Sequence, residues 1–293
     1  MRAVEANDLF VGRTDELQAL DAAWRRAVGG EGGIVAISGE PGIGKTRLAD
    51  EMSARAVESG GRVLSGRAQE LAGAPPYWPW IELIRSLLSA ATADEVGAWL
   101  SGEGAEVARL VPELAGRLET ALAEPSGDAD QARWLLLQGV STFLWSAADD
   151  GPALVILDDL HWANASSTLL LQHFARGLDD RAVLLLVLYR AEPVVGDHPL
   201  LSTLGELGRS RRFERIELSG LSRSEMASFL ESRSSTRPAS SLVDAVSSRS
   251  DGNPLFLREL AAATERAGDA TGLMESLPQG VREAAESRLR LVS

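Results

Sequence analysis

Five short strand-like runs, built around apolar residues and each followed by a stretch of helical character, constrain the fold of this chain more than any other feature. They occupy residues 34–38, 62–65, 153–157, 182–189 and 213–218 of the 293-residue sequence. The third and fourth runs are continuously apolar, which is typical of parallel strands that helices cover on both faces. We therefore predict an α/β fold built on a parallel five-stranded sheet flanked by helices.

The pattern changes after residue 220, where no further strand is predicted. Helical periodicity instead covers residues 221–232, 240–248 and 254–267. We expect an α/β domain over residues 1–220 and a small all-helical lid domain over residues 221–276. The last segment, residues 277–293, begins a further helix.

The connection between the first run and the next helix has the sequence of a phosphate-binding loop. It reads Gly39-Glu40-Pro41-Gly42-Ile43-Gly44-Lys45-Thr46 and is followed by Arg47. A glycine, four residues and Gly-Lys-Thr between a strand and a helix form the P-loop of nucleoside triphosphatases. The glycines let successive amides turn inward around an anion, and the helix N-terminus adds a partial positive charge.

Two side chains of this loop have direct roles in the expected chemistry. Lys45 is expected to reach the β- and γ-phosphates of ATP, and the Thr46 hydroxyl to bind Mg²⁺. Lys45 is also the only lysine among the 29 Lys and Arg residues. The expected nucleotide-binding residues of this segment are Gly39, Pro41, Gly42, Ile43, Gly44, Lys45, Thr46 and Arg47.

Two acids, Asp158 and Asp159, end the third apolar run. Ligands of parallel sheets lie at the carboxyl ends of the strands. We expect Asp158 to hold Mg²⁺ together with Thr46, and Asp159 to orient or deprotonate the attacking water. A solvated strand end is the alternative, and the phosphate loop upstream favours the functional interpretation.

Arg190 directly follows the fourth run. If that strand neighbours the strand before the phosphate loop, Arg190 lies beside the γ-phosphate and can sense its charge. The alternative is a surface arginine after a buried strand.

Charge and composition limit the partners. The 42 acidic residues outnumber the 29 basic ones, which gives a formal net charge of −13. Such a surface argues against an extended contact with DNA phosphates, so we expect no direct DNA binding by this chain. The longest apolar run is far shorter than the ~20 residues of a membrane-spanning helix, and residues 1–7 carry no apolar signal segment. We expect a cytoplasmic protein without a membrane partner.

Four segments occur in an order that resembles a known family. They are Phe10-Val11-Gly12-Arg13, the phosphate loop, Leu157-Asp158-Asp159-Leu160-His161-Trp162 and Gly252-Asn253-Pro254-Leu255-Phe256. The set resembles the nucleotide-binding module of the STAND class of AAA+-related ATPases. It is most similar to the version in large bacterial transcriptional regulators of the LuxR and SARP types.

The resemblance implies further roles for individual residues. Val11 and Arg13 would lie near the adenine and the phosphates, Pro254 would contact the base, and Arg190 matches the sensor arginine of the family. His161 would pack around the magnesium-site loop rather than act in catalysis, although a direct role stays open.

This chain departs from the family at two positions, of which the first weakens the match and the second bears on the rate of hydrolysis. Relatives often carry Asp where this chain has Asn164, and fast AAA+ machines carry Glu where it has Asp159. Because Asp is one methylene shorter than Glu, we expect poorer water activation and slow hydrolysis.

We therefore expect a slow, Mg²⁺-dependent ATPase that switches a bacterial transcriptional regulator between its ATP and ADP states. Nucleotide would set the lid position, the assembly of a homo-oligomer and the activity of a DNA-binding part outside this chain. Residues 277–293 would begin a truncated winged-helix-like segment. A P-loop kinase or motor ATPase with fast turnover is the alternative. A scaffold with a degenerate site is disfavoured by the intact motifs.

The tryptophans have expected places as well. Tyr77, Trp78 and Trp80 form either an effector surface or anchors of a loop to the core. The remaining helical tryptophans, expected in the core from their spacing, are Trp24, Trp99, Trp134 and Trp145.

Overall fold

The structure is a computed structural model that describes residues 10–70, 75–100, 104–117, 128–192, 194–233 and 240–259. The chain divides into two compact units. The larger unit comprises Asp15–Gly39 and Thr46–Glu217. The smaller unit is formed by the described parts of Met1–Thr14, Glu40–Lys45 and Leu218–Ser293.

The larger unit contains the five-stranded parallel sheet that the apolar runs predict. Its strands are β1 (Gly33–Gly39), β2 (Arg62–Arg67), β3 (Ala153–Asp158), β4 (Val183–Tyr189) and β5 (Phe213–Leu218). They lie in the order β2-β3-β4-β1-β5. Because β4 pairs with both β1 and β3, the ends of these three strands are neighbours at one edge of the sheet.

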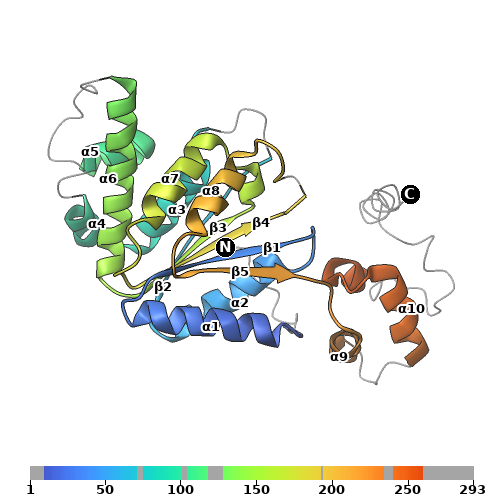
Figure 1. Cartoon of the computed structure of the whole chain (residues 1–293). Helices are drawn as coiled ribbons and strands as arrows, with labels where there is room; N and C mark the ends of the chain where they lie inside the picture. The colour runs from blue at the N-terminus through green and yellow to red at the C-terminus, as the bar shows by residue number, and fades with distance from the viewer. Residues whose placement is uncertain are drawn as a thin grey trace. The chain divides into compact units, whose positions relative to one another are not determined.

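Helices cover both faces of this sheet. They are α1 (Thr14–Val28), α2 (Lys45–Glu58), α3 (Trp78–Ala90), α4 (Ala93–Trp99), α5 (Gly104–Leu110), α6 (Ala129–Asp149), α7 (Ala165–Ala175) and α8 (Pro199–Leu207), with the short 3₁₀ segments η1 (Pro112–Arg117) and η2 (Leu160–Trp162). Figure 1 shows α1 and α2 on one face, and α3, α7 and α8 on the other. This explains why every residue of β3 and β4 is buried.

The tryptophans divide between core and surface. Trp80 is fully buried, meets Phe174 edge-on at 5.4 Å and donates through Nε1 to the Ser167 carbonyl at 3.0 Å, so it anchors the first turn of α3 to the core. Trp24 and Trp99 are buried as expected. The expectation for Trp134 is wrong, because its side chain is 54% exposed. The buried face of α6 begins one turn later, at Leu137.

The smaller unit is helical in its described C-terminal part. It contains α9 (Arg223–Arg233), α10 (Ser240–Ser250) and a short helix over residues 254–259. Its core consists of Leu221, Met226, Leu230, Val243, Val246 and Leu257. A capping box begins α9, since the Ser222 amide donates to Glu225 Oε2 at 2.7 Å and the Glu225 amide to Ser222 Oγ at 3.3 Å.

The turn before the short helix needs glycine. Gly252 has a φ of +71°, and a Cβ atom there would lie 2.4 Å from the Leu221 carbonyl oxygen.

The domain boundaries expected at residues 220 and 276 stay predictions, and the segment 277–293 lies outside the described residues. Within the described part of the chain, every helix is too short or too polar to cross a membrane.

Candidate functional site

Asp158 and Thr46 meet at the edge of the sheet in the larger unit. Asp158 ends β3, its Oδ2 accepts a hydrogen bond from Thr46 Oγ1 at 2.9 Å, and its Oδ1 accepts one from the Asp159 amide at 2.7 Å. Only 8% of Asp158 is exposed. Burial, followed by the negative charge of Asp159, raises the pKa of Asp158 above its usual range.

This pair suits a magnesium ion that also binds a phosphate. Hydroxyl and carboxylate oxygens are the ligands that Mg²⁺ prefers, and the ion usually keeps one or two protein ligands beside phosphate and water. Among the described residues, no cluster of three or more His, Asp or Glu side chains could hold a metal alone. The Thr46 hydroxyl and the Asp158 carboxylate offer two oxygens to a metal ion that is also bound by phosphate.

Asp159 is held by an arginine that the sequence motifs do not include. Its carboxylate Oδ2 accepts from Arg67 Nε at 2.7 Å and also from Arg67 Nη2. This bond raises the pKa of Arg67. The Asp159 backbone adopts the left-handed conformation, with φ +53°, which a non-glycine residue rarely adopts. Arg67 is the last residue of β2 and is paired in register with Asp158, so only the strand order could have revealed it.

Arg190 follows β4, which the sheet places between β1 and β3. The expected role of Arg190 requires that its strand neighbours β1, the strand before the phosphate loop. The strand order meets this condition. The Arg190 amide donates to His161 Nδ1 at 3.4 Å. Within the described part of the chain, the Arg190 guanidinium makes no hydrogen bond or ion pair.

His161 and His198 brace the segments that follow β3 and β4. His161 is 2% exposed. The Leu200 amide donates to His198 Nδ1 at 3.1 Å, so His198 Nε2 carries the proton and donates to the His161 carbonyl at 3.0 Å. These contacts support the packing role expected for His161. Asn164, in turn, caps α7 by accepting from the Ser167 amide at 3.0 Å, a task that Asp could perform equally well.

The phosphate loop lies in the smaller unit from Glu40 to Lys45. Gly42 and Gly44 have φ values of +74° and +105°, as an inward turn of the amides requires. Lys45 is 7% exposed, and its Nζ donates to the Glu40 carbonyl at 2.9 Å. Asn253 Nδ2 donates to the Pro41 carbonyl at 2.9 Å. The sequence pointed to Pro254 of this motif and missed the loop contact of its neighbour.

Arg13 also contacts this loop. Its Nη2 donates to the carbonyl oxygens of Ile43, at 3.1 Å, and of Ser219. Its amide donates to Glu225 Oε1 at 3.0 Å. Burial alone would raise the pKa of Glu225, but hydrogen bonds from Ser222 and from the Arg13 amide outweigh it and lower that pKa.

The other nucleotide-binding candidates have less defined surroundings. Val11, Arg47 and Pro254 are half-buried, and Pro254 opens the short helix over residues 254–259. Their expected contacts with adenine or phosphate stay predictions. Gly39 ends β1 and has a φ of +149°.

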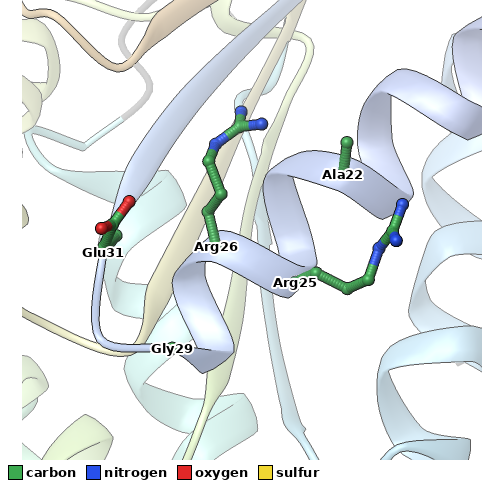
Figure 2. Close-up of a pocket in the computed structure, with 5 residues that line it drawn as sticks. All are labelled: Ala22, Arg25, Arg26, Gly29 and Glu31. Carbon is green, nitrogen blue, oxygen red and sulfur yellow. The ribbon is translucent and has the colours of Figure 1, made fainter.

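A separate hollow of about 510 Å³ lies at the end of α1 (Figure 2). It is lined by Ala22, Arg25, Arg26, Gly29 and Glu31. Arg26 forms an ion pair with Glu214, and Arg25 Nε donates to the Asp21 carbonyl of the same helix at 3.2 Å. None of the residues expected in nucleotide chemistry lines this hollow.

Comparisons with known proteins agree with this geometry. Residues 9–187 match the AAA ATPase domain family. An uncharacterized protein of Rhizobium meliloti (strain 1021) is 25% identical over 267 residues, which are 86% of this chain and 24% of that protein. The chain therefore spans about a quarter of the length of this relative.

Two solved structures are similar to this chain, and one of them has a TM-score above 0.5. The Walker-type ATPase of Pyrococcus abyssi superimposes with a TM-score of 0.60 at 16% identity, over 97% of this chain and 75% of that one. A Signal Transduction ATPase with Numerous Domains, which carries a tetratricopeptide repeat sensor and comes from Pyrococcus horikoshii, gives a TM-score of 0.48 at 17% identity, over 87% of this chain and 30% of that one.

The family match covers more than half of the chain. It includes the phosphate loop, β3 with its two acids, and most of β4. The chain belongs to the AAA ATPase domain family and is a P-loop ATPase domain that binds ATP or ADP.

Proposed function

We propose that this ATPase domain is a slow nucleotide switch of a bacterial transcriptional regulator. The observation that carries the proposal is that each of the two acids at the end of β3 accepts hydrogen bonds from another side chain. Asp158 accepts a hydrogen bond from Thr46, the other candidate metal ligand, while Arg67 occupies the Oδ2 oxygen of Asp159. Such a site favours stable binding of ATP over rapid hydrolysis.

The proposed chemistry assigns one task to each residue. Lys45 binds the β- and γ-phosphates, and Thr46 and Asp158 hold Mg²⁺, which when bound neutralises the phosphate charge. Asp159 accepts the proton of the water that attacks the γ-phosphorus atom. The bond between this atom and the bridging oxygen breaks, which leaves ADP and phosphate. Arg190 stabilises the negative charge on the γ-phosphate oxygens.

Slow turnover has two physical reasons. Asp159 is one methylene shorter than the glutamate of fast AAA+ machines, so it reaches less far towards a water. Its Oδ2 also accepts two hydrogen bonds from Arg67, so this oxygen must leave the guanidinium before it can accept a proton.

The regulatory part of the proposal rests on the resemblance and on chain length. A relative of which this chain is only 24% has room for sensor and effector domains. In the proposal, ATP and ADP set different positions of the helical lid, and the difference passes to a DNA-binding part of the full-length protein. ADP would favour a monomer or weak dimer, and ATP larger homo-oligomers. The net charge of −13 supports the absence of direct DNA binding.

Steady-state turnover tests this function. A kinase or a motor would reach ~1–100 s⁻¹, whereas the proposed switch should turn over well below this range. Hydrolysis with Mg²⁺ should be measured beside transfer of labelled phosphate to cell metabolites. Fast turnover, or labelled acceptor at the expense of free phosphate, would overturn the proposal.

A further inference from the structure

The backbone of a phosphate loop imposes a requirement on its outward side. When successive amides turn inward around an anion, the carbonyl groups between them point away from it. Such carbonyls need partners if the loop is to keep its shape before a nucleotide binds. Side chains supply the donors to three carbonyls of this loop. Glu40 accepts from Lys45, Pro41 from Asn253, and Ile43 from Arg13.

Asn253 is the most buried of these three partners. It is 1% exposed. Its Oδ1 accepts from the Leu255 amide at 3.1 Å, which fixes the amide so that Nδ2 faces the Pro41 carbonyl at 2.9 Å. Its backbone carbonyl accepts from the Leu257 amide at 3.0 Å. Asn253 is thus the N-cap of the helix over residues 254–259 and a donor to the phosphate loop.

The phosphate loop and the start of the helix over residues 254–259 are tightly packed. A Cβ atom at Gly42 would lie 2.7 Å from Leu255 Cβ and 3.2 Å from Asn253 Oδ1. The loop backbone therefore lies directly against the first turn of the helix. A shift of Asn253 would either break the bond to Pro41 or carry the loop with it.

We propose that Asn253 is a positioning residue for nucleotide binding, which holds the phosphate loop in its anion-binding shape through the Pro41 carbonyl. Asn253 acts through the loop and not on the nucleotide. The same side chain begins the helix that carries Pro254, so the loop and this helix respond together to a bound phosphate. The proposal rests on the proposed binding of ATP by this loop.

Asn253→Ser tests the proposal. Serine keeps an N-cap oxygen but is too short to reach Pro41, so the cap survives and the loop contact is lost. We expect at least a tenfold loss of affinity for ATP and for ADP in calorimetry. The melting midpoint of the nucleotide-free protein should stay within a few degrees of the wild type. Asn164→Ser, at the N-cap of α7, is the matched control and should bind both nucleotides as the wild type does.

Asn253→Asp provides a second test, in which the side chain keeps its length. Aspartate caps helices as well as asparagine does, but it would place a carboxylate oxygen against the Pro41 carbonyl. Its loss of ATP affinity should equal or exceed that of Asn253→Ser. Affinities within twofold of the wild type, or a loss that only parallels a lower melting midpoint, would overturn the proposal. If the wild type itself binds no ATP, the proposed function fails instead.

Discussion

Replacing Arg67 with alanine should accelerate ATP hydrolysis. In the wild type, the Oδ2 oxygen of Asp159 must leave the Arg67 guanidinium before it can accept a proton from water. Side-chain exposure is 62% for Arg67 and 12% for Asp159. Solvent screening of such an exposed arginine limits the pair to ~0.5–1 kcal/mol. If this free energy is part of the barrier, its removal raises turnover about two- to fivefold.

The assay is phosphate release under saturating Mg²⁺ and ATP, with ATP affinity measured in parallel. Affinity should change little, since Arg67 bonds to Asp159 and not to the metal-binding pair. Arg85→Ala is the control, because it removes an exposed arginine paired with Glu113 elsewhere in the larger unit. Turnover at or below the wild-type rate in Arg67→Ala would refute the reasoning and assign Arg67 to the orientation of Asp159.

The remaining predictions concern the metal and phosphate contacts. Lys45→Ala should weaken ATP binding at least tenfold, because a charge-assisted hydrogen bond contributes ~1.5–3 kcal/mol; unchanged calorimetric affinity would contradict the phosphate-loop assignment. Arg190→Ala should reduce ATP affinity more than ADP affinity, since its proposed partner is the γ-phosphate, and equal losses would indicate a structural role. Asp159→Ala should spare binding and slow hydrolysis, and a native rate would contradict its assignment. Burial raises the pKa of Asp158 above the ordinary 3.8. The Mg²⁺-dependent affinity for ATP should therefore be complete above that raised pKa and lost as the pH falls through it. Asp158→Asn should show no such loss with pH.

The parallel sheet could be predicted because burial on both faces leaves a plain trace in sequence. Residues 153–157 and 182–189 have no polar interruption, and both form fully buried strands. The phosphate loop could also be predicted from sequence, because few other structures require two glycines and a lysine at these spacings. Trp134 shows the limit of periodicity, which gives the face of a helix but not how far along the helix the core extends.

Arg67 and Asn253 could not be found in the same way. Arg67 meets Asp159 only because β2 pairs with β3, and strand order is a long-range property that local sequence does not encode. Asn253 belongs to a motif that was recognised, yet its bond to Pro41 joins residues 212 positions apart. Both contacts arise from the tertiary arrangement around a motif, which carries no local signal.

The central claim is that nucleotide identity changes the helical part of this domain. Hydrogen–deuterium exchange of residues 218–259 with Mg²⁺ and saturating ATP or ADP tests it most directly, with Lys45→Ala as the non-binding control. We expect the amides of α9 and of the short helix over residues 254–259 to be protected differently in the two nucleotides, and we expect no difference in Lys45→Ala. Identical exchange in ATP and ADP, with both nucleotides bound, would contradict it.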